Sequence, residues 1–163
     1  DAGVTVVHNP CSNMKLNSGI FRMREMLSNR VKLALGTDGC SSNNNLCMRE
    51  EMKFASLWAK ATYGPDVLSK EQVMECATRN GAEAFGIDAG VIAEGELADA
   101  ILVNLADERL LPCHNLISNW VYAADSRCVR SVLCDGRFVM RDGIIAGEKD
   151  IVTQFKDHIQ HRK

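Results

Sequence analysis

The chain has 163 residues, a formal charge of −2 and 46% hydrophobic residues, enough for one buried core or for one core plus a small satellite. The balanced charge offers no basic surface for nucleic acid, and no apolar run approaches the roughly 20 residues that span a bilayer, so neither partner is expected. The seven cysteines include no C-x-x-C pair, and their number is odd. This usage favours reduced thiols and a cytoplasmic protein over a disulfide framework or a cysteine-rich zinc site.

The N-terminal third predicts a βαβ unit. Residues 4–8 form a nearly continuous apolar strand, residues 18–28 have helical periodicity, and residues 31–37 form a second apolar strand. The two strands of such a unit run in the same direction. His8 and Asp38 are therefore expected at the same edge of the sheet, where α/β proteins place their functional sites.

The second strand ends in Gly36-Thr37-Asp38-Gly39, which sets a carboxylate at the end of a buried segment. A carboxylate in that position is costly without a partner, so Asp38 is the first candidate for a functional role. The alternative is an Asp-Gly pair that only forms a turn. The first strand begins almost at residue 1 and would expose a bare edge there, so the chain is expected to begin in the middle of a fold.

The middle of the chain predicts helices. Residues 8–13 and 40–45 read as polar loops, and a helix is expected from Leu46 to about Thr62. Ser69-Lys70-Glu71-Gln72 is a capping box that opens the next helix, and Gly86 is its expected C-terminal cap.

From about Asp88 the periodicity becomes strand-like, and Asp135-Gly136 is a strong hairpin signal. A final helix is expected to begin near Asp150. The predicted strands are residues 91–93, 100–103, 120–122, 129–134 and 137–140, with a short extended segment at 144–145.

Three motifs together carry a family resemblance: residues 7–16 (VHNPCSNMKL), residues 35–39 (LGTDG) followed by Ser42-Asn43-Asn44, and residues 90–100 (GVIAEGELADA). In this order they resemble the C-terminal part of an amidohydrolase-superfamily enzyme, in the branch of 5-methylthioadenosine/S-adenosylhomocysteine deaminases and related chlorohydrolases. The resemblance implies an α/β fold: the last two strands of a (β/α)8 TIM-like barrel with their helices, followed by strands of a small β-sandwich and a terminal helix. The implied boundaries are residues 1–88, 89–147 and 148–163.

The resemblance also implies hydrolytic deamination of a small purine-like or other amino-substituted ring. In that chemistry a divalent metal, zinc or iron, lowers the pKa of a bound water to about 7, and the resulting hydroxide displaces ammonia. Asp38 would be a metal ligand and would accept a proton from the water. The family's other metal ligands are histidines, including a His-x-His pair, which this sequence does not contain. We therefore expect weak or absent metal binding and no activity from this chain alone, a missing N-terminal half of the enzyme as a partner, and a homo-oligomer.

The remaining candidates lie beside Asp38. His8 is expected either to bind substrate or to be a structural histidine with its hydrogen bonds satisfied. Five polar residues are expected to support the two strand-end loops: Asn9, Ser12, Asn13, Asn43 and Asn44. A second hypothesis is a non-catalytic oligomerisation module derived from the same fold. A phosphate-binding βαβ domain is disfavoured because neither glycine-rich phosphate motif is present.

Overall fold

The structure is a computed structural model and describes residues 3–161. Its first part confirms the predicted parallel strand pair, in which His8 of one strand lies opposite Leu35 of the other. The chain therefore leaves both strands at the same edge of the sheet. The elements of this part are β1 (Thr5–His8), α1 (Pro10–Lys15), α2 (Met23–Ser28) and β2 (Lys32–Leu35).

The segment between the two strands differs from its prediction. The expected polar loop after β1 contains α1, because Pro10 occupies the first helical turn, where a missing backbone N–H costs nothing. The helix expected from Ser18 begins only at Met23. Positive φ angles at Asn17 (53°) and Gly19 (90°) are incompatible with a right-handed helix in this part of the segment.

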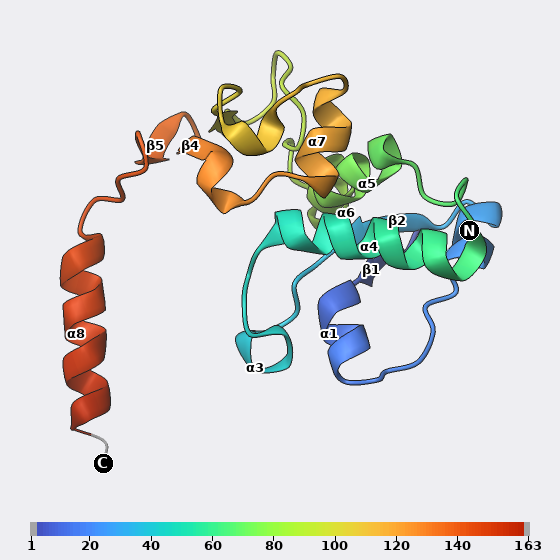
Figure 1. Ribbon diagram of the computed structural model, residues 1–163, viewed down its shortest axis with the longest axis horizontal. Helices are drawn as coiled ribbons and strands as arrows, with labels where there is room; N and C mark the ends of the chain where they lie inside the picture. The colour runs from blue at the N-terminus through green and yellow to red at the C-terminus, as the bar shows by residue number, and fades with distance from the viewer. Residues whose placement is uncertain (1–2, 162–163) are drawn as a thin grey trace.

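Helices cover the strand pair, and Figure 1 shows α4 lying across the molecule with β1 and β2 behind it. The predicted capping box is confirmed, since Ser69 and Gln72 each bond the other's backbone N–H. Gly86 caps the following helix in the left-handed conformation, as expected. The expected single helix between these caps is divided at Thr78. The helices are α3 (Cys40–Asn43), α4 (Met48–Tyr63), α5 (Lys70–Ala77) and α6 (Arg79–Phe85).

The C-terminal part contains an antiparallel sheet with the strand order β3-β4-β5. The predicted hairpin is confirmed: Asp135 and Gly136 both have positive φ and connect β4 to β5. The elements are β3 (Ala100–Val103), the 3-10 helices η1 (Glu108–Leu110) and η2 (Ser126–Cys128), α7 (Leu116–Tyr122), β4 (Val129–Cys134), β5 (Arg137–Met140) and α8 (Glu148–Gln160).

Two of the expected strands are wrong. Residues 91–93 are not a strand, and residues 120–122 belong to α7, whose N-cap Asn115 accepts a hydrogen bond from the Ser118 backbone N–H. A window of three apolar residues is too short to distinguish a strand period from a helical period. Within residues 144–145, Ile144 makes only an isolated bridge to Arg141.

One hydrophobic core joins the N-terminal helices and strands to the segment that surrounds α7. Figure 1 shows α7 above α4 and beside α5, and both helices contact it. The core includes Met52, Ala55 and Ala59 of α4, Val73 and Cys76 of α5, Trp120 and Val121 of α7, and Leu33, Leu35, Leu68, Leu110 and Cys128. The residues after β3 therefore pack on the helices that follow the parallel strands.

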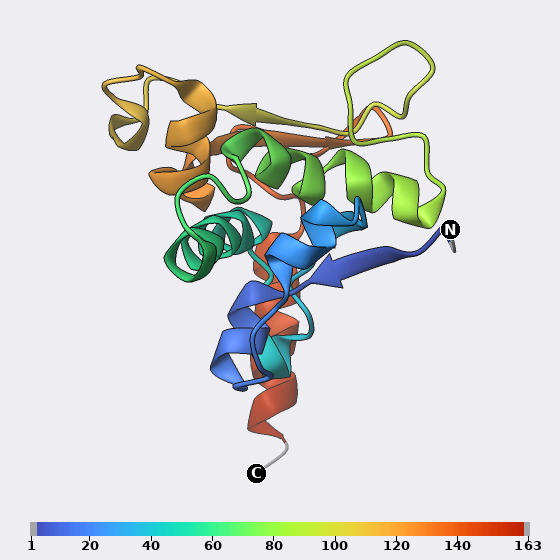
Figure 2. The ribbon, with the colours of Figure 1, turned by 90° about the vertical axis from the view of Figure 1, so that its right-hand side faces the viewer.

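The last helix stands apart from this core. Every residue of α8 is exposed, including its apolar side chains Ile151, Phe155 and Ile159. Figure 1 shows α8 extending away from the other elements, and in Figure 2, where it passes behind α1 and α3, its C-terminal end extends beyond them. Within residues 3–161, no helix combines the length and the apolar character needed to cross a membrane.

Candidate functional site at the ends of the parallel strands

Asp38 lies on the loop that follows β2, with its side chain exposed at the edge where both parallel strands end. Its Oδ2 accepts a hydrogen bond of 2.7 Å from Ser12 Oγ, and its Oδ1 accepts one of 2.7 Å from the Gly39 backbone N–H. The Ser12 hydroxyl and then the Gly39 amide lower the pKa of the carboxyl below its ordinary value. Asp38 is therefore ionised at neutral pH, the state that metal coordination requires.

The helix α1 brings the first strand-end loop to Asp38. Ser12, on α1, is only 2% exposed, and its hydroxyl is the group that bonds the carboxylate. The backbone carbonyl of Asn9 accepts a 2.9 Å hydrogen bond from the Asn13 N–H and so closes the first turn of α1. The Asn9 side chain lies against the backbone of Gly36, where an added Cβ would be 2.4 Å from Asn9 Oδ1.

His8 is the last residue of β1 and lies in an aromatic cluster. Its ring stacks on Phe21 with 4.2 Å between the ring centroids, and Trp58 is tilted against it at 5.7 Å. The residue is 2% exposed, and among residues 3–161 neither of its ring nitrogens has a hydrogen-bond partner. Burial lowers the pKa of His8 from its usual 6.5 to about 4, so the ring is neutral at pH 7. It holds one donor and one acceptor that no described protein group satisfies.

Asn43 and Glu51 bond each other beside the site. The sequence predicted Asn43 as a residue that supports the loops, but it did not indicate Glu51. Asn43 Nδ2 donates to the backbone carbonyl of Thr37 at 2.7 Å and to Glu51 Oε1 at 2.5 Å. Glu51 is completely buried, and its Oε2 accepts the Cys11 N–H at 3.1 Å. Acidic residues are common in the first turn of a helix because they interact favourably with the helix dipole. The position of Glu51 in the sequence therefore did not distinguish it from such residues.

A second connection between the loops was also missed. The ammonium group of Lys15 donates to Asn44 Oδ1 and, at 3.3 Å, to the Ser41 carbonyl. Asn44 ends α3 in the left-handed conformation, with φ of 78°. Through these two hydrogen bonds Lys15 connects the end of α1 to α3.

The described residues do not make up a catalytic metal site on their own. Nowhere in residues 3–161 do three or more His, Cys, Asp or Glu side chains gather in a way that could hold a metal ion. A catalytic zinc site typically has three protein ligands and one open position. Asp38 offers one exposed carboxylate, a group that fits one position of such a set.

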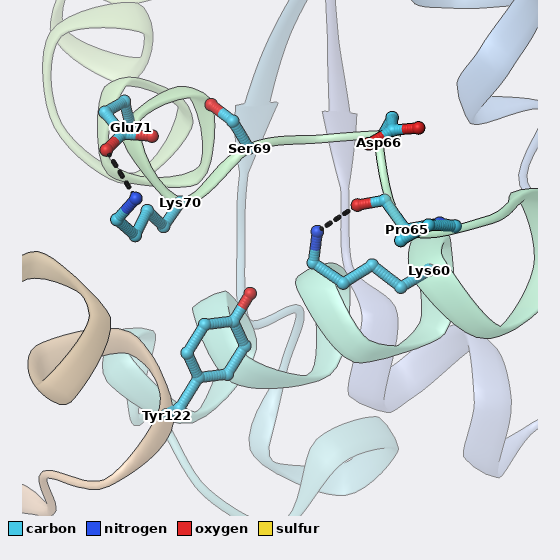
Figure 3. A pocket seen from close by; sticks show the side chains of 7 residues that line it. All are labelled: Lys60, Pro65, Asp66, Ser69, Lys70, Glu71 and Tyr122. Atoms are coloured by element: carbon cyan, nitrogen blue, oxygen red, sulfur yellow. Dashed lines mark hydrogen bonds and ion pairs between the residues drawn. The ribbon is translucent and has the colours of Figure 1, made fainter.

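A cavity of about 350 Å³ lies between the α4–α5 connection and α7, away from the strand-end loops (Figure 3). In Figure 3 the ammonium group of Lys60 points to the Pro65 carbonyl, at 2.7 Å, and that of Lys70 points to Glu71, at 2.9 Å. Both cations are thus engaged within the protein. The lining residues are Lys60, Pro65, Asp66, Ser69, Lys70, Glu71 and Tyr122, and none was predicted to be functional.

Known proteins resemble this chain over almost its whole length. The family model of the amidohydrolase family matches residues 1–139. A 5-methylthioadenosine/S-adenosylhomocysteine deaminase from Archaeoglobus fulgidus is 49% identical over 150 residues, which cover 91% of this chain and 36% of that protein. A 5'-deoxyadenosine deaminase from Methanothermobacter thermautotrophicus is 49% identical over 141 residues, covering 86% of this chain and 33% of that protein.

A solved structure is similar as well. The crystal structure of an adenosine deaminase from Xanthomonas campestris with bound zinc superposes with a TM-score of 0.88 at 35% identity, covering 98% of this chain and 38% of that one. The chain thus spans about a third of the length of the proteins that it matches.

Proposed function

The chain belongs to the amidohydrolase family, with an α/β fold that corresponds to part of a TIM-barrel-like protein, and we propose that it contributes one metal ligand to a hydrolytic deaminase. The observation that carries this proposal is the exposed, ionised carboxylate of Asp38 on the loop after β2, which accepts a hydrogen bond from Ser12 of α1, the helix that follows β1. Strand ends of this kind are where barrel enzymes assemble their active sites.

The substrate we propose is a small adenosine-like molecule that carries a ring amino group. Two relatives at 49% identity are named deaminases of 5-methylthioadenosine and S-adenosylhomocysteine and of 5'-deoxyadenosine. The His8 ring is buried against Phe21 and Trp58 in this chain, so it would have to be uncovered in the assembled enzyme. His8 would then bind the substrate through its ring nitrogens, which have no hydrogen-bond partner among the described residues. In their neutral state they can offer one donor and one acceptor to a heterocycle.

The metal we propose is a divalent ion, zinc or iron, which would supply an activated water when bound. Asp38 would be one ligand, and the others would come from an N-terminal segment of the kind that the longer relatives contain. This chain alone would be inactive. Support comes from the absence, within residues 3–161, of three or more His, Cys, Asp or Glu side chains grouped to hold a metal ion, and from the zinc in the related adenosine deaminase structure.

The layout we propose follows the resemblance. Residues 1–88 would be the end of the barrel, with β1 and β2 as its last two strands, residues 89–147 would be strands of a β-sandwich, and residues 148–163 a terminal helix. Asn9, Ser12, Asn13, Asn43 and Asn44 would support the loops around Asp38. The assembled enzyme would be a cytoplasmic homo-oligomer, and the seven free thiols are consistent with a reducing compartment.

A chimera tests this proposal. The part of this chain that aligns with the Archaeoglobus fulgidus deaminase replaces the matched region of that protein, and ammonia release is measured with 5-methylthioadenosine, S-adenosylhomocysteine and 5'-deoxyadenosine. We expect activity and about one zinc per chain. Asp38→Asn should abolish activity, because a neutral amide is a poor substitute for an ionised ligand, whereas Asp66→Asn, on the α4–α5 connection, should not affect it.

A folded chimera that is inactive with all three substrates, or one that is indifferent to Asp38→Asn, would contradict the proposal. The unmodified 163-residue chain should release no ammonia and should bind no stoichiometric zinc. Tight zinc binding by that chain alone would show that the site does not need further ligands.

The second candidate function is a non-catalytic oligomerisation module. The observation that favours it is the exposed apolar stripe of α8, formed by Ile151, Val152, Phe155 and Ile159. Sedimentation of the chain with and without residues 148–163, taken together with the activity of the chimera, discriminates between the two functions. A stable oligomer that depends on α8, together with an inactive chimera, would favour the module.

A further inference from the structure

The side chain of Glu51 is a carboxylate with no exposed surface, in the first turn of α4. Burying a carboxylate is expensive unless hydrogen bonds replace the water that it loses. No ion pair to Glu51 occurs within residues 3–161, so its partners are neutral N–H groups. A completely buried acidic side chain whose described partners are all neutral requires an explanation.

The two oxygens of Glu51 face different segments of the chain. Oε2 accepts the backbone N–H of Cys11 in the first turn of α1, at 3.1 Å, and Oε1 accepts Asn43 Nδ2 of α3, at 2.5 Å. The same Asn43 amide also donates to the Thr37 carbonyl, at 2.7 Å. One carboxylate therefore connects α4 with both strand-end loops.

Each of these contacts lies one residue away from the site. Cys11 precedes Ser12, whose hydroxyl bonds the Asp38 carboxylate, and Thr37 precedes Asp38 itself. We propose that Glu51 is a positioning residue, which sets the relative placement of Ser12 and Asp38 through the Cys11 N–H and the Asn43 amide. The role rests on the proposed function of Asp38 as a metal ligand. Such outer partners orient the groups that coordinate a metal.

The geometry also explains why a carboxylate occupies this position. Both partners of Glu51 are donors, so both of its oxygens must be acceptors. A glutamine has one acceptor and one NH2 donor, so Glu51→Gln would turn a donor toward the N–H of Cys11 or of Asn43. Glu51→Gln therefore removes one side of the connection while almost preserving the volume of the side chain.

Nuclear magnetic resonance on the full 163-residue chain tests the proposal without metal or substrate. The 13Cγ resonance of Asp38, assigned with Asp38→Asn, is recorded at neutral pH in the wild type and in three variants. In Ser12→Ala the resonance moves because the carboxylate loses its bond to the hydroxyl. In Glu51→Gln we expect a shift in the same direction and at least half as large, and at least tenfold faster hydrogen exchange of the Cys11 amide.

The third variant, Ser56→Ala, is a matched control for lost stability. Ser56 is also completely buried on α4, but its hydroxyl bonds Tyr122 of α7 at 2.6 Å, away from the site. It should leave the Asp38 resonance unchanged. If Cys11 exchange accelerates in Glu51→Gln while the Asp38 resonance stays at its wild-type position, Glu51 has only a structural role and the proposal is overturned.

Asn43→Ala tests the same step if Glu51→Gln does not fold, because it leaves the bond between Glu51 and Cys11 in place. A displaced Asp38 resonance shows that the Asn43 amide, which bonds both Glu51 and the Thr37 carbonyl, places Asp38 as the proposal requires, and an unmoved resonance overturns the proposal. These resonance measurements do not depend on whether the chimera is active. An inactive chimera would remove the catalytic role of Asp38 without changing the resonances measured here.

Discussion

At the scale of single residues, Asp38 adopts a left-handed backbone conformation, with φ of 59°. This conformation costs a residue with a side chain about 1–2 kcal/mol, and Asp and Asn adopt it more readily than most because they can bond locally. The Asp38 carboxylate does so by accepting the N–H of Gly39, the next residue. The backbone strain therefore lies at the residue proposed as the metal ligand, and such strain is often found at functional sites.

His8 carries the pH-dependence prediction. Its pKa is lowered to about 4 by burial, so between pH 6.5 and pH 4 the unfolded chain binds a proton that the folded chain does not. This difference lowers the free energy of unfolding as the pH falls from 6.5 to 4, by about 3 kcal/mol in total, and has no effect above pH 6.5. Urea denaturation of the wild type and of His8→Phe across this range measures it.

The variant His8→Phe keeps an aromatic ring to stack on Phe21 but cannot be protonated. Its free energy of unfolding should therefore fall less than that of the wild type on acidification. His114→Phe, in an exposed loop, should keep the wild-type dependence. Parallel curves for the wild type and His8→Phe would show that His8 is not buried as a neutral ring.

At the scale of elements, the connection from α6 to the C-terminal sheet packs closely against α6 at a glycine. Gly90 has φ of 89°, and a Cβ there would lie 2.7 Å from Arg79 Cα and 2.8 Å from Arg79 N, at the start of α6. These contacts are with backbone atoms, which cannot turn aside as a side chain can. The close approach of this connection to α6 therefore requires glycine.

Gly95 provides the matched comparison, because it has the same φ of 89° and nothing within 4 Å of an added Cβ. Gly95→Ala should cost about 1–2 kcal/mol from backbone strain alone. Gly90→Ala should cost about 1–3 kcal/mol more, because the backbone must also shift. Chemical denaturation of the two variants measures the difference, and equal losses would contradict the close approach.

At the scale of the whole molecule, α7 joins the C-terminal sheet region to the helices that follow β2. Val121 of α7 has no exposed surface and belongs to the same core as Met52 and Ala55 of α4. A shared core implies that the two regions unfold together in one cooperative transition.

The two tryptophans, Trp58 on α4 and Trp120 on α7, allow each region to be followed separately. Trp58→Phe and Trp120→Phe should each leave a single fluorescence transition, measured in urea against the midpoint from circular dichroism in the same variant. Val121→Ala should lower the free energy of unfolding by roughly 2 kcal/mol and shift both reporters equally. Two transitions, of which only one responded to Val121→Ala, would indicate independent units.

The sequence predicted those parts of the fold and site that depend on neighbouring residues. Apolar runs indicated β1 and β2, the capping box and Gly86 marked helix ends, and Asp135-Gly136 marked the hairpin. The Gly-Thr-Asp-Gly segment singled out Asp38. Each signal lies within a few residues, where backbone preference and side-chain spacing act directly.

Only the tertiary structure decided the rest. Glu51 reads as an ordinary acidic residue near a helix start, and its role depends on the Cys11 N–H, 40 residues away. The ties from Lys15 to Ser41 and Asn44, and the helical state of residues 120–122, likewise depend on how distant segments pack. The sequence by itself determined where the chain would place a carboxylate at a strand end. Packing determined which groups hold it there, because burial and hydrogen bonding belong to the assembled core and not to any local pattern.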